Sequence, residues 1–180
     1  MCMFRDLRAD EIECRVARVN EYGVNLLLYK DARCDQNILD ETVGAMNWQR
    51  GHTRDNANCI VSIWDNNKGM WVCKEDTGTE SNTEKEKGLA SDSFKRACFN
   101  WGIGRELYTA PDIKINPAEC NLREKNGKWN CYDSFAVQKI VIEKKRIVAL
   151  AIKNLTTKRT CYIFQDPKWE AERNKGDQNA

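Results

Sequence analysis

The sequence predicts a mixed α+β protein whose chain ends in a β meander, and two kinds of hydrophobic spacing carry this prediction. Several short segments alternate apolar and polar side chains, which is the period of a half-buried β-strand. In two longer segments the apolar side chains recur every three or four residues, as in an amphipathic helix. The chain has 180 residues, of which 41% are hydrophobic and 31% charged. This composition is ordinary for a folded domain with its own core.

Seven segments have the periodicity of strands, and polar turns separate them. Residues 20–23 and 65–69 contain Asn with Gly, a combination that favours turns, so the first four strands are expected to form two hairpins. The last three are rich in β-branched residues and follow one another closely, which indicates a three-stranded meander. The predicted strands are residues 13–20, 24–30, 58–64, 70–74, 137–143, 146–153 and 160–165.

Two helices are predicted from apolar stripes. The first covers residues 32–43 and ends at Gly44, because glycine readily adopts the left-handed conformation that ends many helices. The second is longer: it begins at the capping box formed by Thr83 and Glu86 and ends near residue 101. Its buried stripe is predicted to consist of Ala90, Phe94, Ala97, Cys98 and Trp101.

The predicted organisation has three parts. Residues 1–112 are expected to form the core, and residues 113–165 a C-terminal loop followed by the β meander. Within this second part, residues up to 132 have no clear period and are predicted to be a loop. Residues 166–180 have almost no apolar side chains and are predicted to be a disordered tail.

The composition of the chain leads to predictions about its cellular location and the state of its cysteines. No run of about 18 apolar residues is present, and residues 1–6 lack the apolar region of a signal peptide, so no membrane partner and an intracellular location are expected. The nine cysteines are odd in number and include no C-x-x-C pair. They are expected to be reduced and mostly buried rather than to hold zinc. The net charge of +2 points to no partner by itself.

Candidate catalytic residues are few. His52 is the only histidine, and it lies in a polar stretch that is expected to be a solvated loop. Asp112, Glu143 and Lys145 have the residue types of a metal-dependent nuclease, in which carboxylates hold magnesium and a lysine positions water. However, Glu143 and Lys145 fall at a predicted turn, where solvation alone favours charged side chains. The protein is therefore expected not to be an enzyme and to need no cofactor.

Basic side chains offer a stronger signal for binding. On the long helix, Lys87, Ser91 and Lys95 are spaced four residues apart and form one row beside the buried stripe. Such a row fits a phosphate backbone, although helices also expose lysines simply to remain soluble. Residues 139–159 contain seven cations and one acid, which fits either phosphate binding or protection of strand edges. Further candidates are Arg96 and Arg105 near the row, Arg33 at the start of the first helix, and Arg15 and Arg18 on the first strand.

One segment carries a family resemblance. Residues 87–108, KGLASDSFKRACFNWGIGRELY, resemble the Rad fifty-two family of single-strand DNA annealing proteins, especially its phage branch. In that branch a K-G-x-x-S-D-x-x-K-R-A helix leads into W-G-I-G-R-x-L-Y. Residues 10–16, Arg33, residues 39–44 and residues 47–49 agree in order and spacing as well.

The resemblance implies a β-β-β-α annealing core in which a long helix packs on a curved antiparallel sheet. It further implies a homo-oligomer, either a ring or a helical filament, that holds single-stranded DNA in a basic groove. The implied DNA contacts are Arg33, Lys87, Lys95 and Arg96. Arg15 and Arg105 are added as DNA-binding candidates from their charge and position.

The function that the resemblance implies is ATP-independent annealing of complementary strands in homologous recombination or double-strand break repair. The phage branch suggests the cytoplasm of an infected bacterium as the setting, with a single-strand-binding protein as a candidate further partner. Two alternatives stay open. One is the nuclease of Asp112, Glu143 and Lys145, and the other is a module for double-stranded RNA, because a helix packed on a sheet is also used for that ligand.

Overall fold

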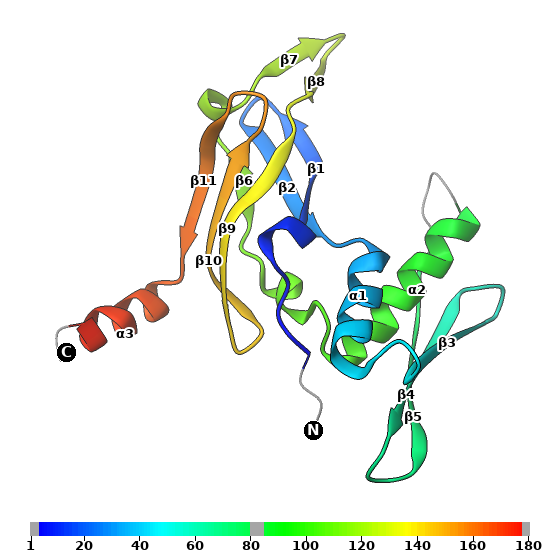
Figure 1. Cartoon of the computed structure of the whole chain (residues 1–180). Helices are drawn as coiled ribbons and strands as arrows, with labels where there is room; N and C mark the ends of the chain where they lie inside the picture. The colour runs from blue at the N-terminus through cyan, green and yellow to red at the C-terminus, as the bar shows by residue number, and fades with distance from the viewer. Residues whose placement is uncertain (1–3, 80–84, 178–180) are drawn as a thin grey trace. The chain divides into compact units, whose positions relative to one another are not determined.

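The computed structural model describes residues 4–79 and 85–177, excluding the side chains of residues 85–87 and 174–177. The fold is mixed α/β, with eleven strands and three α-helices among these residues (Figure 1). Contacts divide the chain into two compact units. The first consists of residues 1–6 and Asp31–Arg105, and the second of Leu7–Lys30 and Glu106–Ala180. The first two strands therefore belong with the C-terminal part of the chain rather than with the core over residues 1–112 that the sequence suggests.

The first unit is a three-stranded antiparallel sheet with helices beside it. Strands β3 (Trp48–Thr53), β4 (Asn58–Asp65) and β5 (Met70–Thr77) pair in this order, and helix α2 (Lys85–Trp101) packs on β4 and β5. Helix α1 (Ala32–Val43) has the predicted bounds and contacts α2. The core between these elements consists of side chains with no exposed surface: Ile38, Leu39, Cys59, Val61, Phe94, Ala97 and Cys98.

Local chemistry explains where α1 begins and ends. The Asp31 side chain accepts a hydrogen bond from the Arg33 backbone N–H at 2.8 Å, which caps the first turn. The helix ends at Gly44, whose φ of 85° favours glycine. The capping box expected at Thr83 and Glu86 lies outside the described residues. Gly78, just after β5, is required for packing, because a Cβ there would lie 2.5 Å from the Ser93 backbone nitrogen of α2.

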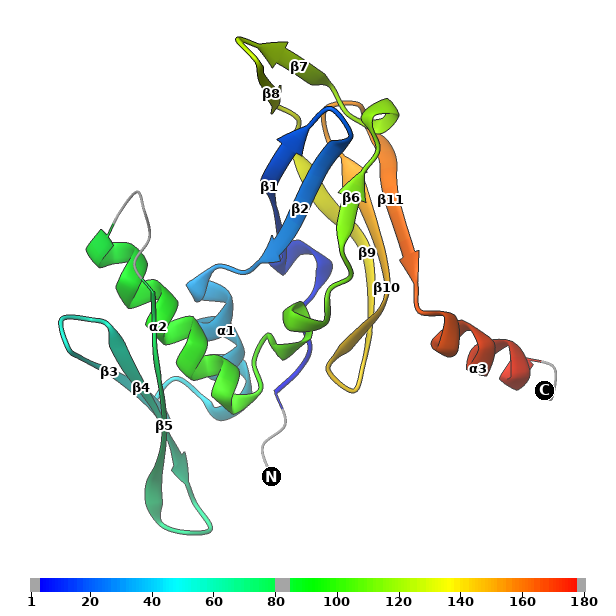
Figure 2. The same ribbon diagram turned by 180° about the vertical axis from the view of Figure 1, so that it is seen from behind.

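The second unit is built on a curved six-stranded antiparallel sheet that is nearly closed into a barrel (Figure 2). Its two edge strands approach each other, and the Tyr162 hydroxyl donates a hydrogen bond to the Asp112 carbonyl at 3.3 Å. The strands in spatial order are β11 (Arg159–Gln165), β10 (Arg146–Asn154), β9 (Phe135–Glu143), β1 (Glu13–Asn20), β2 (Gly23–Tyr29) and β6 (Ile113–Ile115). The three predicted C-terminal strands thus form a meander within a larger sheet.

Hydrogen bonds hold two fully buried polar side chains in the second unit, although Glu106 Oε2 has no partner among the described residues. The Glu106 side chain has no exposed surface, and its Oε1 accepts from the Leu7 backbone N–H at 2.7 Å. Asn154 has no exposed surface either, and its amide donates to Asp133 at 2.8 Å and to the Glu119 carbonyl at 3.1 Å. The first bond joins residues 7 and 106, and the other two join residue 154 to residues 119 and 133, so both sites fasten segments that are distant in the sequence. The apolar core around them includes Val24, Leu26, Ile113, Ile115, Leu150 and Ile152.

The structure differs from the sequence predictions in three elements. β3 was not predicted, because its residues WQRGHT show little apolar alternation. Residues 110–132, predicted to be a loop, contain β6, the 3-10 helix Pro117–Glu119, β7 (Leu122–Lys125) and β8 (Lys128–Cys131). Helix α3 (Pro167–Asp177) lies in the segment predicted to be a disordered tail, and Asp166 caps it by accepting from the Lys168 N–H at 2.9 Å.

A fourth difference concerns the long helix. The resemblance implied that it packs on the curved antiparallel sheet. Instead, α2 packs on the small sheet β3–β4–β5, while the curved sheet belongs to the other unit. The reason is non-local pairing, because β1 and β2 pair with β9 and β6, which come after α2 in the chain.

Candidate nucleic-acid interface

Helix α2 contacts two cations of its own sheet. Arg50 of β3, Val61 of β4 and Lys74 of β5 lie side by side in the strand register. The Arg50 guanidinium is 4.7 Å from the centroid of the Phe94 ring, and the Lys74 ammonium is 4.7 Å from that of the Trp101 ring. Both contacts are cation–π interactions, in which a long side chain covers an aromatic ring while its charge stays near water. Two cations of the sheet therefore lie against aromatic side chains of the helix.

Another cation, Arg33, pairs with Asp31 at the start of α1. The Arg33 guanidinium pairs with the Asp31 carboxylate at 2.7 Å, and 83% of its side chain is exposed. Hydrogen bonds from Arg33 lower the pKa of Asp31, and the nearby charge of Lys95 lowers it further. Arg33 lies on α1 and Lys95 on α2, two helices that contact each other, and both residues are among those that the sequence predicts to bind DNA. Asp31 neutralises part of their positive charge.

Two other predicted DNA-binding residues mainly serve the fold of the same unit. Arg96 pairs with Asp76 of β5 at 3.3 Å, and its buried Nε has no hydrogen-bond partner among the described residues. Arg105 donates hydrogen bonds to the carbonyls of Phe99 at 2.8 Å and Asn100 at 2.9 Å. These carbonyls belong to the last turn of α2, where backbone acceptors lack helical partners. Arg105 therefore caps this helix. The side chain of Lys87 lies outside the described residues.

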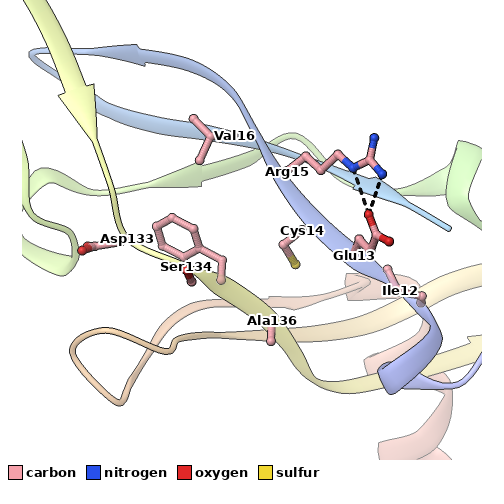
Figure 3. Close-up of a pocket in the computed structure, with 9 residues that line it drawn as sticks. Ile12, Glu13, Cys14, Arg15, Val16, Asp133, Ser134 and Ala136 are labelled. Atoms are coloured by element: carbon pink, nitrogen blue, oxygen red, sulfur yellow. Dashed lines mark hydrogen bonds and ion pairs between the residues drawn. The ribbon is translucent and has the colours of Figure 1, made fainter. Parts of the chain in front are cut away.

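Arg15 lies in the other unit. Its guanidinium pairs with Glu13 at 2.6 Å and lies 4.7 Å from the centroid of the Tyr29 ring. It also lines a pocket of about 470 Å³ between β1 and residues 133–136, where β1 and β9 pair at Glu13 and Ala136 (Figure 3). Cys14 lines this pocket too, and burial, assisted by Cys161, raises the pKa of its thiol to about 12. A neutral thiol is a poor nucleophile, so the pocket offers no evident covalent chemistry.

The residues of the nuclease alternative take separate partners. Asp112 pairs with Lys114 at 2.8 Å and accepts from Asn25, whereas Glu143 accepts a hydrogen bond from the Trp169 indole at 2.6 Å. Lys145 lies in the β9–β10 turn. Among the side chains that the structure describes, no three or more His, Cys, Asp or Glu residues are arranged to hold a metal ion.

The sequence made predictions about the surroundings of His52 and of the cysteines, and the structure can be compared with both. His52 lies half-buried on β3, not in a solvated loop, and its Nδ1 is 3.5 Å from the Ser93 hydroxyl. Burial and the charge of Arg50 lower its pKa. The eight cysteines within the described part of the chain are free thiols, but only Cys34, Cys59 and Cys98 are buried, and Cys73 is exposed. The expectation that most of them are buried is therefore met only in part, although burial raises the pKa of the half-buried Cys120 and Cys161 to about 11.

Sequence reasoning missed Arg50 and Lys74. Lys74 lies at the end of a predicted strand, but its partner Trp101 is far away in the sequence. Arg50 alternates with Trp48 and His52 on β3, and this alternation of large side chains is the one local signal that could have revealed the strand and the face that carries Arg50.

Comparison with known proteins assigns no family to the chain. No protein-family model matches the chain, and no curated protein matches its sequence. None of the helices within residues 4–79 and 85–177 is long and apolar enough to span a membrane. The class of the protein is therefore defined by its mixed α/β fold. Its candidate site is defined by the cations around α2.

Proposed function

We propose that this protein binds single-stranded DNA and anneals complementary strands without ATP, in homologous recombination or double-strand break repair. The observation that carries the proposal is the packing of α1, which carries Arg33, against α2, which carries Lys95. Both positions match the family resemblance of the sequence. The order β3, β4, β5, α2, with the helix packed on its sheet, is the arrangement that we assign to the β-β-β-α annealing core.

The chemistry of such a site suits annealing. Lysine and arginine bind phosphates and release counterions, which gives affinity without base selection. A strand that is held by its backbone leaves its bases available for a second strand. Base pairing then supplies both the sequence recognition and the driving free energy, so no hydrolysis is required. We further propose that protomers assemble into a ring or filament, so that successive sites hold one continuous strand.

The decisive experiment measures annealing of two labelled complementary oligonucleotides in EDTA. The protein should accelerate duplex formation, and both strands should keep their full length on a denaturing gel. Arg33→Ala and Lys95→Ala should each weaken binding for all sequences alike and lower the slope of log K against log salt by about 0.7. Lys68→Ala, an exposed lysine of the same unit paired with Asp65, is the control and should leave the slope unchanged.

Three results would overturn the proposal. One is a protein that ignores oligonucleotides at low ionic strength. Another is magnesium-dependent shortening of DNA that is lost on changing Asp112 or Glu143, which would favour the nuclease. The third is duplex RNA that displaces single-stranded DNA efficiently, which would favour the RNA-binding module. Electron microscopy of the protein with and without oligonucleotide tests the proposed assembly.

A further inference from the structure

The β7–β8 hairpin of the second unit carries a separate group of cations. Its two strands are joined by Asn126 and Gly127, whose φ values of 54° and 72° are both positive. Positive φ at both central residues defines a two-residue turn whose twist matches that of antiparallel strands. The pairing of the hairpin is therefore well defined, and with it the face on which each side chain lies.

This register places the cations of the hairpin on one face. Residues directly opposite each other share a face. Arg123 lies opposite Asn130, and Lys125 lies opposite Lys128, so the three cations share a face with no acidic residue of the hairpin. Glu124 is paired with Trp129 on the other face. We call Arg123, Lys125 and Lys128 the basic hairpin face.

The cations of the basic hairpin face do not stabilise the fold through ion pairs among the described residues. All three are exposed, and none forms an ion pair with a residue in the described part of the chain. Lys125 and Lys128, placed directly opposite each other, repel, and like charges in this position destabilise a sheet. An anion bound to this face would remove the repulsion. Arg50, Arg96 and Arg105 differ, because each contacts a ring, a carboxylate or a carbonyl.

An aromatic side chain adjoins the basic hairpin face. Tyr132 follows β8 directly, and 77% of its surface is exposed. Residues two apart on a strand are about 7 Å apart, so Arg123 and Lys125 extend the positive charge along the hairpin. Cations that follow a backbone together with an exposed ring are the usual means of holding a single strand, whose unpaired bases can stack on aromatics. In a duplex the bases are stacked inside the double helix, so they are less able to stack on an exposed aromatic ring.

We propose that the basic hairpin face is a second contact surface for single-stranded nucleic acid, which binds phosphates through Arg123, Lys125 and Lys128 and stacks a base on Tyr132. The inference rests on the proposed function for the kind of ligand and goes beyond it in assigning a surface on the other unit. It involves none of the residues that the sequence predicted to bind DNA.

The test is a titration of a fluorescently labelled oligo-dT over a range of salt concentrations. The triple variant R123Q/K125Q/K128Q should bind more weakly and lower the salt slope by about 2, which is three contacts at about 0.7 each. Tyr132→Ala should weaken binding about 5-fold or more with the slope unchanged, because a stacked base contributes about 1–3 kcal/mol. The matched control K68Q/K114Q/K168Q removes the same charge from three scattered, exposed lysines and should change the slope little.

The possible outcomes separate this inference from the proposed function. If the wild-type protein does not bind oligo-dT, the proposed function fails, and this inference with it. If the wild-type protein binds and Arg33→Ala weakens it, but the hairpin triple variant keeps the wild-type slope, only the inference is overturned. The inference would also be overturned if the salt slope fell equally in the scattered control. Displacement of oligo-dT from the hairpin by polyglutamate or by duplex DNA would overturn it as well. Circular dichroism should show that the triple variant is folded.

Discussion

The guanidinium of Arg50 and the stacked indole of Trp48 both contact the ring of Phe94, the former 4.7 Å and the latter 6.1 Å from its centroid. Arg50 and Trp48 come from β3, whereas Phe94 is the fully buried anchor of α2. One aromatic ring thus fastens the helix to a strand that has little hydrophobic content of its own. It also keeps a cation beside the helix that carries Lys95.

The Phe94 contact predicts a large effect on stability. Phe94→Ala should lower the free energy of unfolding by about 3–5 kcal/mol, since it removes a fully buried aromatic side chain and leaves a cavity. Arg50→Met, which keeps most of the side-chain stem, should cost about 1 kcal/mol or less. Urea unfolding followed by tryptophan fluorescence measures both. Tyr108→Ala, at a 72% exposed position, is the control, and an equal loss in this variant would contradict the assignment of Phe94 to the core.

The position of Asp31 predicts a gain in binding. Asp31→Asn removes a negative charge that is paired with Arg33 and influenced by the charge of Lys95, while it keeps a residue that caps helices well. Single-stranded DNA should therefore bind about 2- to 5-fold more tightly, in line with the roughly 0.5–1 kcal/mol of an exposed charge pair. Fluorescence anisotropy at fixed salt measures the change. Weaker binding with intact helix content would show that the Asp31 cluster does not face the DNA. Asp10→Asn is a charge-matched control in the other unit.

Arg105 should be needed for stability rather than for DNA binding. Arg105→Ala removes two hydrogen bonds to the last carbonyls of α2 and should cost about 1–2 kcal/mol of unfolding free energy. Its salt slope for oligo-dT should equal that of the wild-type protein when both are fully folded. A slope lower by about 0.7 with unchanged stability would restore Arg105 as a phosphate contact.

The Asp133 network predicts a dependence of stability on pH. Burial alone would raise the pKa of Asp133, but hydrogen bonds from Asn121 and Asn154 hold it below its ordinary value. Because the folded pKa is lower than the unfolded value of about 3.9, the ionised carboxylate stabilises the fold above that pH. This contribution is lost as the pH falls through the folded pKa.

Asp133→Asn should therefore be less stable than the wild-type protein at pH 7, and the difference should shrink as the pH approaches 3. Asn154→Ala, which removes two donors from a fully buried site, should cost about 1–3 kcal/mol at pH 7. Urea midpoints measured at several pH values test both statements. A difference between Asp133→Asn and wild type that stays constant down to pH 3 would mean that the carboxylate does not titrate with folding.

The site was predictable in part. Arg33 and Lys95 were named as DNA contacts through the family resemblance, and Lys95 also belongs to a helical row that spacing predicts. That their two helices contact each other depends on how α1 packs on α2, and no spacing along the chain encodes it. The partners of Arg96 and Arg105 within the fold were not predicted, because charge alone does not tell which cation forms an ion pair or a helix cap.

The sequence by itself determined the bounds of α1 and β1, the long amphipathic stripe of α2 and the meander of β9, β10 and β11. Each follows from side chains a few residues apart, through period, capping and turn chemistry. Only the tertiary structure decided that β1 and β2 join β9 and β6 and that the weakly apolar β3 is a strand. Strand pairing is non-local, so the partner of each strand is set by the packing of the whole unit and not by its own residues.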